Sequence, residues 1–78
     1  MIKLDILTPE WSRSLEVDAV FLPGAMGEFE VLVNHAPIIS TLVEGKVRWR
    51  CGDEVEIFEV KGGVVRLENN EMQICAKI

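Results

Sequence analysis

Few residues in this 78-residue chain have types and spacing that could do chemistry. The only histidine, His35, has no serine or cysteine neighbour at a spacing that would make it the base of a nucleophile. Glu28 and Glu30 would share one face of a strand and could form a carboxylate pair, but solvated charges on an exposed edge are the more common arrangement. Gly62-Gly63 lacks the Lys-Ser/Thr and the helix of a phosphate-binding loop. The sequence therefore predicts no catalytic residue.

The two cysteines, Cys51 and Cys75, are too few for a disulfide framework, and one histidine does not complete a zinc site with them. We therefore expect no metal and no cofactor. Because free cysteine behaves as a small apolar side chain, both residues are expected to be reduced and buried in strands.

Length and charge exclude further classes of protein. The length allows a single domain, and a hydrophobic content of 49% predicts a compact core with an apolar surplus that hints at a partner. The formal net charge of −5 argues against nucleic acid and anionic lipid as partners. No run approaches the roughly 20 apolar residues that cross a bilayer, and no signal peptide is evident, so we expect a cytosolic protein without lipid insertion.

Turn-forming residues gather around His35 in the stretch from Pro23 to Pro37, PGAMGEFEVLVNHAP. The Pro-Gly and Met-Gly pairs in its first half predict turns, because proline fixes one backbone angle and glycine permits positive φ. Phe29–Val33 then has the alternation of a short strand, which Asn34 can end in the left-handed conformation. His35-Ala36-Pro37 turns the chain again.

The elements that position this stretch are expected to be strands. Leu15–Phe21 is polar on one face at its start and apolar on both faces at its end, so it passes from a sheet edge into the interior or under a partner. Ile38–Val43 could be helical by hydrophobicity, but its length and β-branching favour a strand. Further strands are predicted at Ile2–Ile6, Lys46–Cys51 and Val55–Val60 and on both sides of Asn69-Asn70.

Turn length and face matching predict the strand registers. A three-residue loop, Gly52-Asp53-Glu54, would place Trp49 opposite Ile57 and Arg50 opposite Glu56, which keeps apolar and charged faces separate. A turn at Gly62-Gly63 would pair Val60 with Val65. A turn at Asn69-Asn70 would pair Leu67 with Met72 and Val65 with Ile74. With about eight short strands and no helical spacing, the fold class is all-β, a single small sandwich or barrel.

Three segments carry motifs in a fixed order. Leu4–Glu10 is an alternating strand that ends in Thr-Pro-Glu, Leu22–Pro37 contains Pro-Gly-x-x-Gly-Glu and His-Ala-Pro, and Phe58–Val65 contains Val-x-Gly-Gly-x-Val. Together they resemble the epsilon subunit of the rotary F1Fo ATP synthase. The resemblance covers nearly all of residues 1–78 but only the N-terminal domain of that family, and it implies a β-sandwich of two mainly antiparallel sheets.

The resemblance implies a non-catalytic rotor subunit in a hetero-oligomer, held between the gamma subunit and the membrane c-ring at the cytoplasmic face of the energy-coupling membrane. Glu28 and His35 match the family's acidic residue after a glycine and its His-Ala-Pro histidine, at the end that faces the ring and gamma. Ile38, Ile39 and Leu42 cannot all face inward from one strand. Either a partner covers the outward side chains, or the domain's own sheets and turns cover both faces of the strand. The expected partner-contact residues are Glu28, His35, Ala36, Pro37, Ile39 and Leu42.

The sequence departs from the family at two places. Val33-Asn34 stands where members commonly carry Pro-Gly, which removes a rigid proline from the turn. The family usually continues into a C-terminal helical hairpin that can restrain ATP hydrolysis or bind ATP, whereas this sequence ends at Ile78. If 78 residues is the natural length, we expect a domain that couples rotation without inhibiting hydrolysis and without binding ATP.

A stand-alone binding module is the alternative function. In that case an OB-like β-barrel would use Trp49 and Phe58 to stack on a ligand. The acidic charge disfavours it, because single-strand binders combine aromatic residues with a basic groove.

Overall fold

The computed structural model describes residues 1–78 and contains nine strands. No helix long and apolar enough to cross a membrane is present. The strands are short runs rich in β-branched residues and separated by turn residues, as β-structure favours. They are β1 (Ile2–Leu7), β2 (Ser12–Val17), β3 (Ala19–Gly24), β4 (Gly27–Leu32), β5 (Ile38–Leu42), β6 (Gly45–Cys51), β7 (Glu54–Val60), β8 (Gly62–Glu68) and β9 (Glu71–Lys77).

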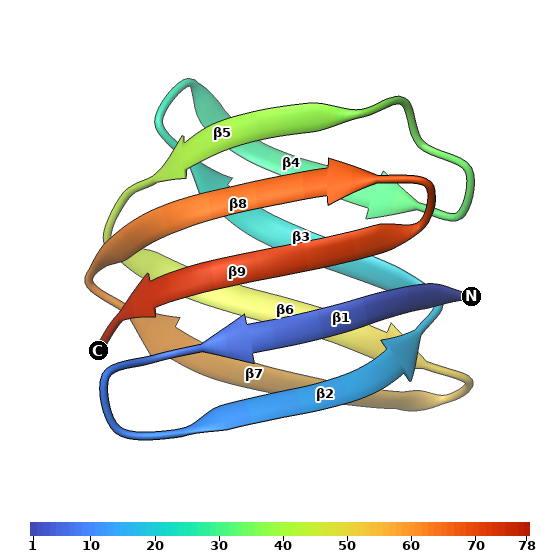
Figure 1. Ribbon diagram of the computed structural model, residues 1–78, viewed down its shortest axis with the longest axis horizontal. Coiled ribbons are helices and arrows are strands. Elements are labelled where there is room, and N and C mark those ends of the chain that lie inside the picture. The colour runs from blue at the N-terminus through green and yellow to red at the C-terminus, as the bar shows by residue number, and fades with distance from the viewer.

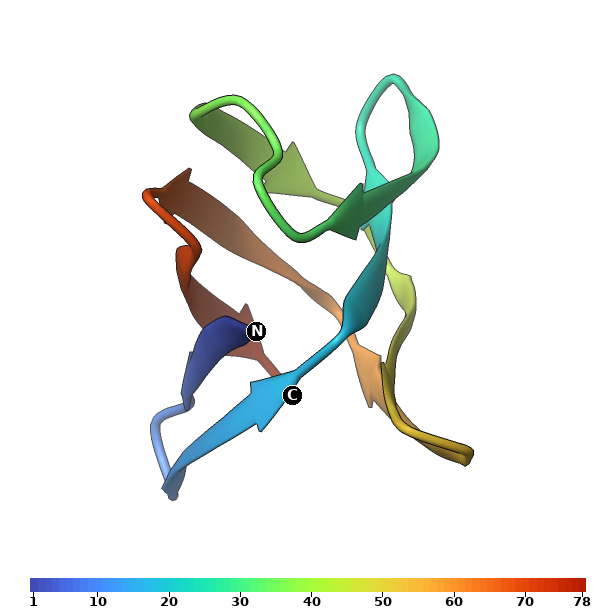
Figure 2. The ribbon, with the colours of Figure 1, turned by 90° about the vertical axis from the view of Figure 1, so that its right-hand side faces the viewer.

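The strands form one strongly curled sheet whose two halves face each other as a small β-sandwich (Figure 1, Figure 2). One half has the order β4-β3-β6-β7 and the other β5-β8-β9-β1-β2. They join where Gly24 of β3 pairs with Leu42 of β5. All pairings are antiparallel except that of β1 with β9. The expected all-β sandwich of mainly antiparallel sheets is confirmed.

The core lies between the two halves and consists of alternate residues of the strands. β1 and β9 show the alternation most clearly, since every second residue of each is buried. The buried cluster comprises Ile2, Leu4, Ile6, Val17, Val20, Leu22, Val31, Leu42, Val47, Trp49, Val60, Val65, Leu67, Met72, Ile74 and Ala76.

The predicted strand Leu15–Phe21 is in fact two strands, β2 and β3, separated by a bend at Asp18. The Asp18 N–H donates to the Arg50 carbonyl oxygen (2.8 Å), and its carboxylate accepts the Gly52 N–H (2.7 Å). Asp18 occupies a polar position in the alternation of apolar and polar residues. The bend therefore leaves that alternation unchanged, and the alternation could not predict it. The predicted passage from edge to interior is confirmed, because β2 is an edge strand and β3 lies between β4 and β6.

The predicted register of β6 with β7 is wrong. The loop has two residues, and Trp49 lies opposite Glu56 and Arg50 opposite Val55. Gly52 has φ 61° and is the first central residue of the turn, the position where a type II′ turn requires glycine. Face matching failed here because neither face is uniform near the edge of the sandwich. The inward face carries the half-exposed Glu56 side chain, and the outward face carries the exposed Ile57.

Glu56 points inward, where it pairs with Arg13 from the other half of the sandwich. Arg13 of β2 forms a bidentate ion pair with Glu56, with N···O distances of 2.8 and 3.2 Å, and its guanidinium lies 5.6 Å from the centre of the Trp49 ring. The hydrogen bond from Arg13 lowers the pKa of the Glu56 carboxyl and raises the pKa of Arg13. This pair closes the sandwich between β2 and β7, the strands at the bottom of Figure 1.

The chain after β7 does not turn back at Gly62-Gly63, so the predicted pairing of Val60 with Val65 is wrong. Instead β8 crosses to the other half of the sandwich and pairs with β5 and β9. A Cβ atom at Gly63, whose φ is 149°, would collide with the carbonyl oxygen of Cys75. The glycine therefore permits close approach of two strands rather than a hairpin.

The turn at Asn69-Asn70 is confirmed, with both asparagines at positive φ (50° and 60°). Its register is also as predicted, since Leu67 pairs with Met72 and Val65 with Ile74. Cys51 and Cys75 are free and lie in strands as expected, but both are exposed, which corrects the prediction that they are buried. Cys75 belongs to the outward set of β9, and Cys51 is the last residue of β6, beyond the cover of the core.

Candidate partner-binding surface

Several apolar side chains of β4, β5 and their flanking loops are exposed. These elements lie at the top of Figure 1. We call this surface, residues 25–43, the β4–β5 side. It carries five of the twelve large apolar side chains that remain exposed: Met26, Leu32, Val33, Ile39 and Val43. Met26, at the tip of the β3–β4 hairpin, is completely exposed, and Ile39 is 76% exposed. Large apolar side chains left exposed in this number within one segment are a feature of protein-contact regions.

Glu28 lies near the start of β4 with its side chain on the outer face. Its carboxylate accepts a hydrogen bond from the Arg48 guanidinium at 3.2 Å, and 61% of the Glu28 side chain stays accessible. Arg48 in turn stacks on the Phe21 ring, 4.6 Å from its centre. The ion pair orients the carboxylate while leaving it available to a partner.

His35 lies just beyond the end of β4 in the loop that leads to β5. Asn34 precedes it with φ 66°, as the sequence predicted, and the His35 N–H donates to the Leu32 carbonyl oxygen at 3.2 Å. The ring Nδ1 is 2.7 Å from the Ala36 carbonyl oxygen, which can only accept, so Nδ1 carries a proton. The ring is half-buried, whereas Ala36 and Pro37 are exposed.

The predicted contact residues are not gathered around one turn. Glu28 and His35 lie at opposite ends of β4, and both belong to the β4–β5 side. Ile39 is on the outer face of β5, opposite Arg66, beside a shallow hollow of about 610 Å³ that Pro37 also lines. Leu42 is only 3% exposed and belongs to the core.

Met26, Leu32, Val33 and Val43 complete this surface and were missed by the sequence reasoning. Their apolar character gave no signal, because alternation alone cannot distinguish an outward apolar side chain from an inward one. A hairpin tip placed between two turn signals was the only clue to the exposure of Met26.

The geometry offers no catalytic constellation. Glu28 and Glu30 share the outer face of β4, but Glu28 is paired with Arg48. No three His, Cys, Asp or Glu side chains lie close enough together to hold a metal ion. His35 makes its side-chain hydrogen bond to a backbone carbonyl.

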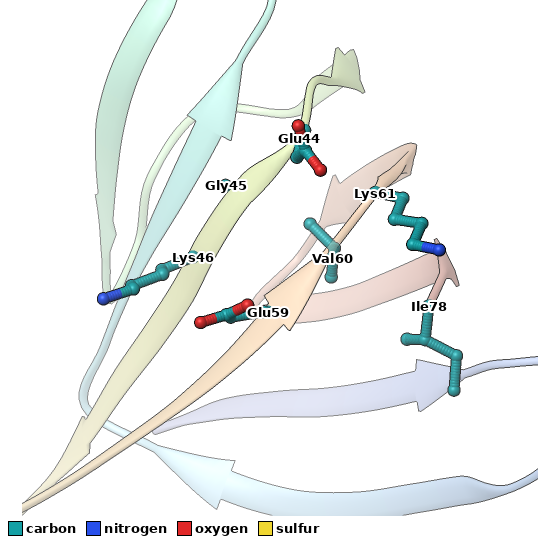
Figure 3. A pocket seen from close by; sticks show the side chains of 7 residues that line it. All are labelled: Glu44, Gly45, Lys46, Glu59, Val60, Lys61 and Ile78. Carbon is teal, nitrogen blue, oxygen red and sulfur yellow. The ribbon is translucent and has the colours of Figure 1, made fainter.

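A second hollow, of about 410 Å³, lies where β6, β7 and the C-terminus meet. Figure 3 shows that Lys46 and Lys61, on its two sides, point in opposite directions rather than toward a common point. Glu44, Glu59 and Ile78 also line it. Charges of both signs that diverge in this way do not define a ligand site.

The aromatic residues of the alternative function are not available for stacking. Trp49 is 4% exposed and packs on Phe58, with ring centres 5.6 Å apart. Trp11 also packs on Phe58, in an edge-to-face arrangement with ring centres 6.1 Å apart. These rings form part of the core and its rim rather than a platform for a ligand.

Comparison with known proteins gives consistent matches. Residues 1–78 match the family described as ATP synthase, Delta/Epsilon chain, beta-sandwich domain. The ATP synthase epsilon chain of Caulobacter vibrioides is 44% identical over 62 residues, which cover 80% of this chain and 72% of the relative. The epsilon chain of Leptospira interrogans serovar copenhageni is 35% identical over 74 residues, 94% of this chain. The chain spans 58% of the length of that relative.

Two solved structures with the same fold are of ATP synthase assemblies. A chain of the Euglena gracilis mitochondrial ATP synthase, OSCP/F1/c-ring, superposes with a TM-score of 0.90 at 19% identity, over 96% of this chain and 49% of that one. A chain of the Tetrahymena thermophila mitochondrial ATP synthase, central stalk/c-ring, gives 0.86 at 15% identity, over 99% and 63%. At these identities the likeness establishes the fold.

Proposed function

This chain belongs to the family of the β-sandwich domain of ATP synthase delta/epsilon chains, and we propose that it is a non-catalytic subunit of the central stalk of a rotary ATP synthase. In this role it links the gamma subunit to the membrane c-ring, so that ion-driven rotation of the ring reaches the catalytic subunits through gamma. The observation that carries the proposal is the family match over all 78 residues.

A linking subunit needs stiffness and contact surface rather than reactive groups. Of 48 backbone hydrogen bonds, 41 lie within the strand ladders, so most of the backbone is fixed by the sheet. The curled sheet is joined at the β3–β5 corner and closed at the other side by the Arg13–Glu56 pair. Such a body transmits torque without deforming, because packed β-sandwiches have few low-energy internal motions.

The β4–β5 side is the surface that we assign to the ring and gamma. It combines exposed apolar groups with an oriented carboxylate, the composition of a protein interface with a polar rim. The contact residues are Glu28, His35, Ala36, Pro37 and Ile39, together with Met26. Leu42 supports this surface from within the core.

We propose that this domain is peripheral to the membrane, as part of the F1 sector, and that it lies at the cytoplasmic face. Contacts are then made with protein surfaces, since the formal charge of −5 does not suit direct binding to anionic lipid.

Reconstitution tests the function. Inverted membrane vesicles from a strain of the same organism that lacks its epsilon chain are supplied with the purified chain, and ATP synthesis driven by an imposed ion gradient is measured. We expect the chain to restore synthesis. A Leu42→Ala variant serves as a control for damage to the core, because it lowers stability without changing the exposed surface. A stable, folded chain that binds the vesicles no better than serum albumin would contradict the proposal.

A further inference from the structure

The three non-glycine residues with positive φ are all asparagines, and two of them meet in space. Asn34, at the end of β4, has φ 66°, and Asn70, in the β8–β9 turn, has φ 60°. Asparagine tolerates this conformation better than other residues with a Cβ atom. Asn34 and Asn70 are 36 positions apart in the sequence, and they connect the two halves of the sandwich.

Two hydrogen bonds of opposite direction join them. The Asn34 N–H donates to Oδ1 of Asn70 at 2.6 Å, and Nδ2 of Asn70 donates to Oδ1 of Asn34 at 3.0 Å. The arrangement fixes the orientation of the Asn70 amide. Rotating that amide by 180° would place its Nδ2 against the Asn34 N–H, donor against donor, and its Oδ1 against Asn34 Oδ1, acceptor against acceptor.

Asn70 is itself held from a third direction. Its carbonyl oxygen accepts the Lys3 N–H at 2.8 Å, which ties the β8–β9 turn to β1. The segment His35–Pro37 follows Asn34 directly, so its starting point is fixed relative to three strands. A segment ordered before binding loses less conformational entropy when a partner binds.

We propose that Asn70 is a positioning residue for His35–Pro37: its side chain holds Asn34, and through it this segment, in the conformation that the partner recognises. This inference rests on the proposed function. In this proposal Asn70, in the β8–β9 turn, acts through Asn34 rather than by contacting the partner itself.

Matched substitutions separate the side-chain link from the backbone conformation. Asn70→Gly retains the positive φ but removes both hydrogen bonds of the link, one to the Asn34 N–H and one to Asn34 Oδ1. Asn69→Gly is the control, because Asn69 lies in the same turn with φ 50° and its side chain makes no hydrogen bond. Asn70→Asp is the conservative rescue, since a carboxylate accepts the Asn34 N–H and, after rotation of the Asn34 amide, a second bond from that side chain.

The first measurement uses the chain alone. Amide hydrogen exchange by NMR should show the Asn34 N–H exchanging about fivefold to tenfold faster in N70G than in the wild type, and near the wild-type rate in N69G and N70D. The amide fingerprint of the core strands confirms that each variant is folded. Equal exchange in N70G and N69G would overturn the proposal.

The second measurement is the affinity of each variant for ATP synthase stripped of its epsilon chain. N70G should bind several-fold more weakly than N69G, and N70D should bind like the wild type. Faster exchange in N70G with unchanged affinity would overturn the positioning role while leaving the proposed function intact. Failure of the wild-type chain to bind would overturn the proposed function itself, and the positioning role with it.

Discussion

The Glu28 carboxylate pairs with Arg48 at 3.2 Å, and both side chains of this ion pair are exposed to solvent. Exposed ion pairs contribute little to stability. Replacing Glu28 by alanine should therefore change the free energy of unfolding by no more than about 0.5 kcal/mol, as should His35→Ala. Both variants should bind the rest of the ATP synthase more weakly. Urea unfolding and a binding titration measure the two effects.

Glu30→Ala is the matched control for Glu28→Ala, since both residues lie on the outer face of β4 and Glu30 makes no ion pair. A stability loss of several kcal/mol with normal binding would show that Glu28 and His35 are structural. Equal weakening of binding by Glu30→Ala would attribute the effect to net charge rather than to an oriented carboxylate.

The exposure of both cysteines makes a second prediction at the residue scale. Neither Cys51 nor Cys75 is bonded to another sulfur, and both are exposed. Iodoacetamide should therefore label two thiols per chain in the native protein, without reductant or denaturant. Intact-mass measurement counts the labels, and labelling that requires denaturation would contradict the structure.

At the scale of the elements, two glycines with positive φ separate strain from collision. At Gly52 a Cβ would meet no atom within 4 Å, so Gly52→Ala adds only backbone strain, about 1 kcal/mol. At Gly63 the Cβ would also strike the Cys75 carbonyl oxygen, so Gly63→Ala should cost more than about 2 kcal/mol. Urea unfolding of both variants tests this, and equal losses would mean that β8 and β9 can separate cheaply.

The Arg13–Glu56 pair predicts how the closure between β2 and β7 depends on pH. Because the pKa of Glu56 is lowered in the folded state, the pair stabilises the fold above the ordinary pKa of glutamate, and this contribution is lost as pH falls through the lowered pKa. Glu56→Gln should therefore melt slightly below the wild type at neutral pH. The difference should vanish in acid and shrink in high salt.

Glu54→Gln is the control for that comparison, because Glu54 lies in the same strand and forms no ion pair. A difference between wild type and Glu56→Gln that persists at acid pH would mean that the carboxylate does not act through its charge.

Local chemistry predicted some pairings and could not predict others. Asn69-Asn70 revealed its turn and register because both residues accept positive φ and the strands on each side alternate regularly. Gly62-Gly63 offers the same turn chemistry, yet the chain crosses between the two halves there. Whether two glycines reverse a chain or let two strands approach depends on residues far away, here Cys75. The inward Glu56 likewise pairs with Arg13, which belongs to the other half of the sandwich.

The resemblance indicated Glu28 and His35–Pro37, and the apolar excess of the next strand added Ile39 and Leu42. Neither signal described how these residues are arranged in the fold. The exposure of Met26 and the burial of Leu42 follow from how β3, β4 and β5 meet at the corner, which periodicity does not describe.

At the scale of the whole molecule, the chain is a small body with principal extents of 26 × 24 × 18 Å, and we propose that the β4–β5 side is its contact surface. A closed sandwich with an apolar side is suited to transmit force between two larger partners. The hollows at β6–β7 and beside Ile39 are open rather than enclosed. The family match and this surface both support the proposed role as a link in the stalk.

Native mass spectrometry tests that role most directly. The purified chain is mixed with gamma and with the c-ring in detergent, both from the same organism, first separately and then together. The account predicts a complex that contains one copy each of this chain, gamma and the ring, and it predicts less of that complex when Met26→Glu and Ile39→Glu are introduced together than when the β2 control Ser12→Glu is introduced. A folded wild-type chain that remains free in the presence of both partners would contradict the account.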